Sequence, residues 1–273
     1  MNDKRSLTIS LAIDFVRRFG FLTYDLFGDL LGSVSRFQKF RRWQELLESG
    51  CFKPSQKNPK VLYLTQKGFR RAGPNAVKRK YFYHVDHDSI VAKLVLRLKH
   101  HFVISSYWTE TELKMFAWDA IGVLGVEDLN KIPDLVVDFK TVDGFVRVAF
   151  EIEASRKSAD RYDQIALAYL EMNRVDLVLY GCATEQIEEQ VLRAFTGEAF
   201  ETAGKCPATF SLVDFSTREL SASTLFWSRS MSLADLLLAS GATMSRHSRE
   251  SEDATRVSSS ELSEGVLKIK NAA

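Results

Sequence analysis

The amino-terminal part of the chain has apolar side chains at helical spacing, interrupted by glycine. Apolar residues recur every three or four positions over residues 7–19 and again over residues 24–31, and a glycine follows each run. Ser33 or Ser35 is a suitable N-cap for a third helix that runs to residue 47. The pattern therefore predicts three consecutive helices.

The third predicted helix carries apolar and basic side chains on different faces. Its apolar positions follow intervals of three or four residues, and we expect them to pack in the core. They are Val34, Phe37, Phe40, Trp43 and Leu47. The basic residues lie mostly on the other side, where they are free to meet a negatively charged partner. They are Arg36, Lys39, Arg41 and Arg42.

A predicted β-hairpin follows these helices. Apolar residues at 51–52 and 61–64 flank a polar segment, residues 54–60, that is rich in Pro, Asn and Lys. The basic side chains of this tip are Lys53, Lys57 and Lys60. Three helices and such a hairpin resemble a winged helix-turn-helix, with residues 63–68 resembling the second wing strand of many bacterial members. We expect this unit to span residues 1–72.

The winged-helix resemblance leaves two functions open. In one, the third helix enters the major groove of DNA while the wing lysines contact phosphates. In the other, the unit contacts proteins. Gly73-Pro74 and several basic residues predict a linker over residues 73–83, which separates this unit from the rest of the chain.

The pattern beyond the linker predicts a mixed domain of helices and strands over residues 84–238. Asp143-Gly144, between two β-rich runs, is a strong hairpin signal. The predicted helices cover residues 86–98, 158–173 and 185–195. The predicted strands cover residues 102–108, 135–139, 145–153, 175–180 and 210–215. This order matches the α-β-β-β-α-β core of the restriction-endonuclease-like PD-(D/E)xK fold, so we expect an α+β or α/β fold with a mixed sheet.

The last predicted segment, residues 239–273, is rich in serine and charged residues and has no aromatic side chain. Such a composition buries too little apolar surface to fold, so we expect a disordered tail. The tail either binds a coupling or relaxosome accessory protein or has no partner.

Charge is distributed unevenly along the chain, although the net charge is only +2. The first 83 residues hold 17 Lys and Arg against 6 Asp and Glu, whereas the remaining 190 hold 20 against 29. This asymmetry favours a basic unit that faces phosphate groups, with a solvated lysine-rich surface as the alternative.

The remaining composition indicates a soluble cytoplasmic protein. Cys51, Cys182 and Cys206 are far apart and lack Cys-x-x-Cys spacing, which argues against a disulfide framework and a zinc knuckle. No apolar run approaches the ~18 residues of a membrane span, and the amino terminus lacks the apolar segment of a signal peptide. We therefore expect no membrane partner.

Three acidic residues lie where two predicted strands meet. Asp134 precedes one strand of the predicted hairpin, and Glu151 and Glu153 lie near the end of its partner. Because strand side chains alternate, both glutamates share a face, and an antiparallel register brings Asp134 to the same end. Clustered carboxylates repel one another unless a hard divalent cation neutralises them, so we expect Mg²⁺ or Mn²⁺ as the cofactor.

A nearby lysine adds to this cluster. Lys157 follows Glu153 by four residues and is placed to reach the scissile phosphate of a DNA strand, where a divalent ion activates the attacking water. The alternative is that both glutamates face solvent on an amphipathic strand. The mostly apolar run before them, residues 145–150, instead predicts a strand that is buried on both faces.

Several short motifs follow one another in this region: Pro133-Asp134, Phe150-Glu-Ile-Glu153 and Arg161-Tyr162. Together with the winged helix and a helix that begins near His87, they resemble the replication-relaxation family, which includes MobC-type relaxases of mobilisable plasmids. The resemblance covers residues 5–182. It implies a protein that recognises an origin of transfer and nicks one DNA strand there.

The same resemblance assigns roles to individual residues. Asp134, Glu151 and Glu153 match the acidic motifs of the family, and His87 matches a histidine at the head of its first helix. Trp108 and Glu112 resemble a W…E signature that follows this helix. The chain departs from many nucleases of this fold in having E-x-E instead of E-x-K, so catalysis requires Lys157 to supply the missing cation.

Histidine and tyrosine side chains near the cluster have alternative roles. His84, His87 and Asp88 lack the second His or Cys cluster that a zinc site needs. His87 is therefore either a capping or core residue, or a proton donor above the carboxylates. Tyr162 either packs on the sheet or is a nucleophile that becomes linked to DNA.

These observations predict a metal-dependent endonuclease that binds double-stranded DNA at an origin-like site and nicks it. Asp134, Glu151 and Glu153 would hold the metal, with Lys157 and His87 assisting. One alternative is a non-catalytic replication initiator, relaxosome accessory protein or transcription regulator that keeps the nuclease fold as a scaffold. Another is a protein-binding winged helix joined to an unrelated α/β domain.

Overall fold

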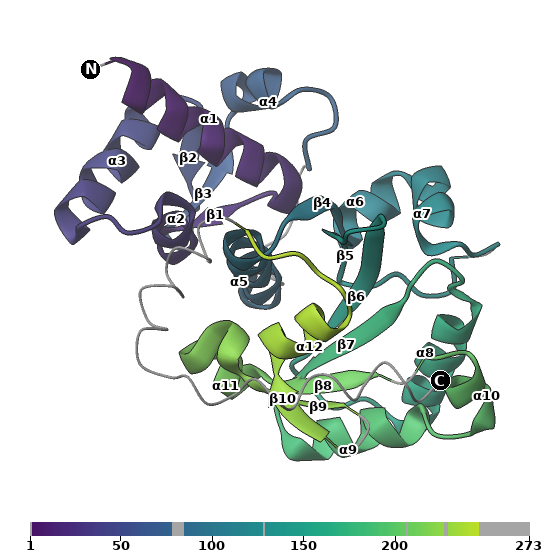
Figure 1. Cartoon of the computed structure of the whole chain (residues 1–273). Coiled ribbons are helices and arrows are strands. Elements are labelled where there is room, and N and C mark those ends of the chain that lie inside the picture. The colour runs from purple at the N-terminus through teal and green to yellow at the C-terminus, as the bar shows by residue number, and fades with distance from the viewer. Residues whose placement is uncertain (1, 78–84, 128, 206, 227–228, 246–273) are drawn as a thin grey trace, which may run out of the picture.

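The computed structural model describes residues 2–77, 85–127, 129–205, 207–226 and 229–245 of the chain. The protein is a mixed α and β structure with a three-stranded sheet near the amino terminus and a seven-stranded sheet beyond it (Figure 1). None of the described helices is long and apolar enough to cross a membrane.

The amino-terminal elements are four helices and the three strands of the smaller sheet. They are α1 (Asn2–Phe19), β1 (Leu22–Thr23), α2 (Tyr24–Leu31), α3 (Arg36–Glu48), β2 (Phe52–Pro54), β3 (Val61–Leu64) and α4 (Gln66–Ala72). The sheet has the order β1-β3-β2, and both pairings are antiparallel. The three helices and the hairpin predicted for this region are present.

Two local signals set the turn between α2 and α3. Gly32 ends α2 with a φ of 69°, a conformation that residues with a Cβ atom rarely adopt. Ser35 then begins α3, because its hydroxyl accepts a hydrogen bond from the backbone N–H of Gln38. The side chain of Gln38 accepts one in return from the N–H of Ser35, which completes a capping box.

The predicted apolar stripe of α3 is wrong for two of its aromatic residues. Trp43 is 5% exposed and packs against the rings of Tyr24 and Phe27, whereas Phe37 is 73% exposed and Phe40 is 54% exposed. Steps of three residues drift around a helix by about 60° each, so Phe37 points about 120° away from Trp43. Only the carboxyl-terminal half of the stripe therefore reaches the core.

The basic residues of α3 divide between solvent and the neighbouring helix. Arg36 and Arg41 are exposed, whereas Lys39 and Arg42 are half-buried. The ammonium group of Lys39 lies 4.2 Å from the centroid of the Tyr24 ring on α2. Lys39 therefore helps to hold α3 against α2, and the arginines at 36 and 41 share the outer surface of α3 with the two exposed phenylalanines.

The segment after β3 is a helix and not a continuation of the wing strand. Thr65 caps α4 by accepting a hydrogen bond from the backbone N–H of Gly68. Of the predicted linker, residues 73–77 are described and residues 78–83 lie outside the described residues. Val77 is tied back to the first helix, since its N–H donates to the carbonyl oxygen of Arg17 at 2.8 Å.

The rest of the chain forms a seven-stranded sheet with helices around it. Its helices are α5 (Val85–His101), α6 (Glu110–Met115), α7 (Ala117–Leu124), α8 (Ala159–Glu171), α9 (Glu185–Ala194), α10 (Glu198–Thr202), α11 (Leu212–Arg218) and α12 (Leu233–Ala239), with a 3₁₀ turn at Glu219–Ser221. Its strands are β4 (Ile104–Thr109), β5 (Leu135–Lys140), β6 (Phe145–Glu153), β7 (Leu177–Cys182), β8 (Ala208–Ser211), β9 (Ser223–Phe226) and β10 (Arg229–Ser232).

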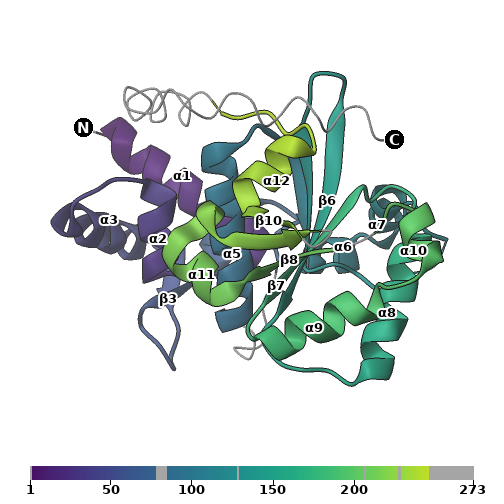
Figure 2. The same ribbon diagram turned by 60° about the horizontal axis from the view of Figure 1, so that its bottom comes forward.

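The large sheet has the order β10-β9-β8-β7-β6-β5-β4. The central strands β6, β7 and β8 are parallel to one another, and the strands on either side pair antiparallel. Helices α5, α11 and α12 cover one face, and α7, α8 and α9 cover the other (Figures 1 and 2). The fold is therefore mixed α and β, as predicted.

The amino-terminal unit packs against the larger part through α5. Buried residues of α1, α2 and the small sheet belong to the same hydrophobic cluster as those of α5 and the sheet face that it covers. Arg97 of α5 adds polar contacts, because its guanidinium lies 2.9 Å from the carboxylate of Asp29 in α2 and 2.7 Å from that of Glu219. One continuous core thus spans both parts.

Strand β6 is buried on both faces as predicted, but it includes a charged residue. Arg147 is 7% exposed and forms two hydrogen bonds, of 2.6 and 2.7 Å, with the carboxylate of Asp138 on β5. A third bond, of 2.5 Å, runs from its guanidinium to the carbonyl oxygen of Val123. This pairing lets an arginine lie inside a sheet and reinforces the register of β5 against β6.

Several elements of the second part differ from the prediction. The predicted strand at 210–215 becomes helix α11 after Ser211, whose hydroxyl accepts a hydrogen bond from the N–H of Asp214. Helices α6, α7, α10 and α12 and the hairpin of β9 and β10 were not predicted. Each of these elements is short, so it contains too few repeats of an apolar pattern to be recognised in the sequence.

The first residues of the predicted tail are bound to the folded part of the chain. Thr243 donates a hydrogen bond to the carbonyl oxygen of Lys140 and accepts one from the N–H of Val103, and Ser245 donates to the carbonyl oxygen of His101. These backbone bonds hold the segment against α5 and the edge of the sheet. Residues 246–273 lie outside the described residues.

The burial of α3 predicts opposite outcomes for two aromatic substitutions. Trp43→Ala should lower the free energy of unfolding by about 3–5 kcal/mol, because it removes a buried ring from the contact with α2. Phe37→Ala should change it by less than about 0.5 kcal/mol, since that ring is exposed. Urea denaturation followed by circular dichroism measures both, and equal losses would contradict this orientation of α3.

Candidate functional site

The register of β5 against β6 brings the predicted carboxylates to one end of the sheet. Leu135 lies opposite Phe150, so Asp134, one residue earlier, is beside Glu151. The carboxylate of Asp134 accepts a hydrogen bond of 2.7 Å from the backbone N–H of Ile152. Sequence alternation and the hairpin turn were therefore sufficient to place these groups near one another.

Glu151 is a buried carboxylate with contacts to two neighbouring elements. It is 2% exposed, and one of its oxygens lies 2.8 Å from the ammonium group of Lys131. Its other oxygen accepts a hydrogen bond of 2.5 Å from the hydroxyl of Tyr169, which is on α8. Glu151 is thus held from two sides, by Lys131 of the loop before β5 and by Tyr169 of α8.

Burial and mutual attraction together set the pKa values of Glu151 and Lys131. Burial raises the pKa of Glu151 to about 7, although Lys131 opposes the shift, and the negative charge of Asp134 adds to it. Burial lowers the pKa of Lys131, but attraction to Glu151 and Asp134 outweighs burial and raises it. Lys131 therefore stays charged, whereas Glu151 takes up a proton near neutral pH.

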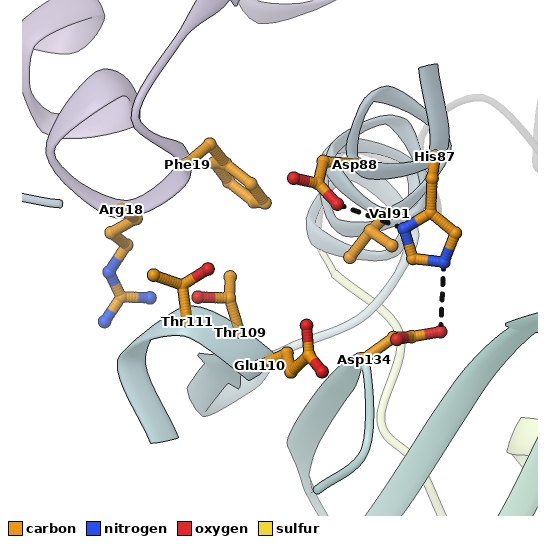
Figure 3. A pocket seen from close by; sticks show the side chains of 9 residues that line it. All are labelled: Arg18, Phe19, His87, Asp88, Val91, Thr109, Glu110, Thr111 and Asp134. Atoms are coloured by element: carbon orange, nitrogen blue, oxygen red, sulfur yellow. Dashed lines mark hydrogen bonds and ion pairs between the residues drawn. The ribbon is translucent and has the colours of Figure 1, made fainter. Parts of the chain in front are cut away.

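Asp134 is paired with the predicted histidine. Figure 3 shows the imidazole of His87 between Asp88 and Asp134, with Nδ1 3.0 Å from the former carboxylate and Nε2 3.3 Å from the latter. Nε2 also lies 3.2 Å from the carbonyl oxygen of Ile152. Both ring nitrogens thus face oxygen acceptors, which suits the doubly protonated, charged imidazole. His84 lies outside the described residues.

The two partners shift each other's pKa in opposite directions. The hydrogen bond to Asp134 raises the pKa of His87 more than burial lowers it. Burial alone would raise the pKa of Asp134, but the hydrogen bond and charge of His87, aided by Lys131, lower it. A cavity of about 20 Å³ lies beside this pair, with room for roughly one water molecule.

Glu153 and Lys157 form the third pair of the cluster. Glu153 is 2% exposed, and its carboxylate contacts the ammonium group of Lys157. That ammonium group lies 5.8 Å from the centroid of the Tyr162 ring. Lys157 therefore supplies positive charge beside the E-x-E motif, as the sequence predicted.

Tyr162, considered either as a packing residue or as a nucleophile, is buried against the sheet in this structure. It is 2% exposed, and its hydroxyl accepts a hydrogen bond of 3.4 Å from the backbone N–H of Lys157. Burial raises its pKa, which disfavours the phenolate that a nucleophile needs. Glu112, in the W…E signature, completes a capping box with Thr109 at the start of α6, and Trp108 is half-buried on β4.

The three carboxylates do not converge on one point. Among the described residues, no group of three or more His, Cys, Asp or Glu side chains is arranged to hold a metal ion. Each carboxylate has a cation of its own instead, from α5, from the loop before β5 or from the segment before α8. The predicted cluster is therefore a row of ion pairs at one end of the sheet.

One buried polar group beside this row lacks a partner. Tyr180 lies next to Glu151 in the parallel pairing of β6 and β7, and both belong to the same sheet face. Its side chain is fully buried, and within the described structure its hydroxyl has no hydrogen-bond partner. A buried hydroxyl without a partner costs free energy, so a bound water molecule or ion near Glu151 would stabilise this position.

The exposed basic groups of the predicted DNA-binding surface lie on the amino-terminal unit. They are Arg36, Arg41, Lys53, Lys57 and Lys60, with Lys39 and Arg42 half-buried. Sequence reasoning missed Lys131, Tyr169 and Tyr180. Lys131 precedes Asp134 by three residues, so its position beside the Pro-Asp motif was a usable signal, whereas the tyrosines reach Glu151 only through folding.

Substituting Glu151 should change how stability depends on pH. Because its pKa is raised, the folded protein binds the proton more tightly than the unfolded chain does. The contribution of Glu151 to the free energy of unfolding is therefore greatest below the ordinary glutamate pKa. This contribution falls by about 3 kcal/mol as the pH rises to 7 and above. Glu151→Gln should remove this decline.

Chemical denaturation from pH 5 to pH 8, with a chelator present, measures the effect. Glu189→Gln changes an exposed carboxyl group of α9 and serves as the matched control, which should keep the wild-type profile. A Glu151→Gln profile parallel to that of the wild type would show that Glu151 keeps its charge throughout this range.

Comparisons with known proteins add no relative to this description. The resemblance to the replication-relaxation family therefore stays a prediction. No protein-family model, no curated protein and no solved structure matches this chain.

Proposed function

We propose that this protein binds double-stranded DNA through a winged-helix unit and nicks one strand at the carboxylate cluster. The observation that carries the proposal is the pair of strand ends at which Asp134 and Glu151 lie side by side, with Glu151 buried although it is a carboxylate. Acidic groups whose pKa values are shifted by burial and by a charged partner cluster at functional sites and also occur in structural ion-pair networks.

The amino-terminal topology supports the winged-helix assignment. Three helices, a short first strand and a hairpin form one unit, in which β1 pairs with β3 and β3 with β2. The outer surface of α3 and the hairpin tip carry exposed arginines and lysines. Such a surface suits phosphate contacts, with α3 as the element that meets base edges.

The order of the larger part supports a PD-(D/E)xK-like nuclease core. Helix α5, strands β4, β5 and β6, helix α8 and strand β7 occur in the predicted α-β-β-β-α-β order, with the short helices α6 and α7 inserted between β4 and β5. Asp134 and Glu151 take the positions of the first two motif residues, and Glu153 takes that of the usual lysine. Lys157, paired with Glu153, provides a cation at this third position.

The donor atoms of Asp134 and Glu151, with Glu153 adjoining, are of the kind that a divalent cation prefers, and the three side chains would have to turn from their protein cations toward one point to bind it. All three supply hard oxygen donors, which Mg²⁺ and Mn²⁺ prefer. The partnerless hydroxyl of Tyr180 beside Glu151 supports a bound species at this point. When bound there, the cation would stabilise negative charge on a phosphodiester and activate water.

The protein's own cations would act on the substrate. Lys157 would exchange its contact with Glu153 for one with a phosphate oxygen, and His87 is placed to donate a proton from above Asp134. Lys131 would favour the ionised form of Glu151, against the effect of burial. An origin of transfer is the DNA site that the family resemblance implies.

One observation favours a second candidate, a DNA-binding protein without catalysis. The three carboxylates already have three protein cations, so the cluster is charge-balanced without a metal. In that case the nuclease fold is a scaffold for a replication initiator, relaxosome accessory protein or regulator. The two exposed phenylalanines of α3 also suit a protein-binding use of the winged helix.

A nicking assay separates these candidates. The wild-type chain should convert a supercoiled plasmid that carries the cognate origin into the open circular form when Mg²⁺ or Mn²⁺ is present. Glu153→Ala should slow this conversion roughly 100-fold, because Lys157 loses the group that positions it. Glu189→Ala, at an exposed position of α9, should nick at the wild-type rate.

The outcomes point in different directions. Binding of the plasmid without nicking under either metal would favour the non-catalytic candidate. Nicking that survives in Glu153→Ala, and also in Asp134→Asn, would locate the activity elsewhere. If the chain does not bind the plasmid at all, both candidates fail.

A further inference from the structure

A cleft separates α1 of the amino-terminal unit from α5 and β4 of the larger part. Its volume is about 640 Å³, which is within the range of small-molecule sites. Apolar side chains of all three elements form its walls, and its polar lining is mostly basic. The charged residues of the lining are Asp14, Arg17, Arg18 and Lys99.

Three of these groups gather around one aromatic ring. The guanidinium carbon of Arg18 lies 3.9 Å from the centroid of the Tyr107 ring, and the ammonium group of Lys99 lies 4.8 Å from it. Arg17 is close enough to lower the pKa of the same tyrosine, although burial raises that pKa overall. Like charges therefore lie near one another in the lining of the cleft.

Carboxylates neutralise only part of the positive charge in the cleft. Arg18 is paired with Glu112, whose carboxylate lies 3.3 Å from its guanidinium. Among the described residues, Arg17 and Lys99 have no carboxylate within ion-pair distance. Burial and the charge of Arg18 lower the pKa of Lys99, and Asp14 only partly opposes them. An anion in the cleft would relieve this repulsion.

The cleft adjoins the carboxylate cluster. Arg18 and Phe19 line both this cleft and the small cavity that contains His87 and Asp134. Figure 3 shows Arg18 and Phe19 across that cavity from His87 and Asp134. A group bound by Arg17 and Lys99 would therefore lie on the far side of Arg18 from the acidic residues.

We propose that this cleft binds a phosphate group, with Arg17 and Lys99 as its cationic contacts and Ser105 as a hydroxyl donor at its edge. The assignment rests on the proposed function in one respect: the phosphate would belong to the DNA strand that flanks the nicked position. A free nucleotide presents the same chemistry and would use the same contacts.

The salt dependence of DNA binding tests whether the phosphate belongs to a DNA strand. Each phosphate contact adds about 0.9 to the slope of log affinity against log salt. Lys99→Ala and Arg17→Ala should each reduce this slope by about that amount, with thermal unfolding used to check that both variants fold. Lys93→Ala, a cation of α5 outside the cleft, is the matched control and should leave the slope unchanged.

A thermal-shift experiment with inorganic phosphate and with ATP tests whether the cleft binds a free nucleotide. Stabilisation of the wild type by ATP, lost in Lys99→Ala, together with an unchanged DNA slope, would assign the cleft to a free nucleotide. If both the DNA slope and the thermal shifts are unaffected by the two substitutions, the cleft binds no phosphate and the inference is overturned. If the chain binds no DNA, the proposed function fails, and the ATP arm still decides the cleft.

Discussion

Three carboxylates can be buried at one end of a sheet only if positive charge accompanies them, because an ionised carboxylate loses its hydration on burial. In this protein each carboxylate meets that requirement with a different cation. The pairs are Asp134 with His87, Glu151 with Lys131 and Glu153 with Lys157. These cations come from the start of α5, the loop before β5 and the segment before α8. The acidic cluster thus joins elements that are far apart in the sequence, and its charge balance determines what it can bind.

The same helix that brings His87 to the cluster also carries the amino-terminal unit. Further along α5, Arg97 contacts Asp29 of α2, and one hydrophobic cluster continues from α1 and α2 into the face of the large sheet that α5 covers. Arg18 of α1 adds an ion pair with Glu112 at the start of α6. On the proposed function, this packing fixes the distance between the DNA site that α3 contacts and the strand position that is cut.

The strongest sequence patterns predicted the elements that position the cluster. Long periodic helices, the Asp-Gly hairpin and alternation along β6 were sufficient to place Asp134 beside Glu151. Burial on α3 was predicted wrongly for Phe37 and Phe40, because residues 34–40 fit an apolar stripe as well as Trp43 does, and only the tertiary contact with α2 selects between them. The individual ion pairs were also out of reach, because the sequence indicated only that Lys157 and His87 lie near the cluster and not which carboxylate each contacts. Lys131 contacts Glu151 from the loop before β5, and Tyr169 contacts it from helix α8. The spacing of residues along the chain does not encode such contacts.

DNA binding is the claim on which the cleavage site, the cleft and the division of labour between the two parts all depend. Its most direct test is the affinity of the full chain for double-stranded DNA across a series of salt concentrations. The account predicts that log affinity falls linearly with log salt, and that replacing Lys53, Lys57 and Lys60 of the hairpin with alanine reduces the slope by about one per phosphate contact removed. An absence of DNA affinity, or an affinity that does not change with salt, would contradict it.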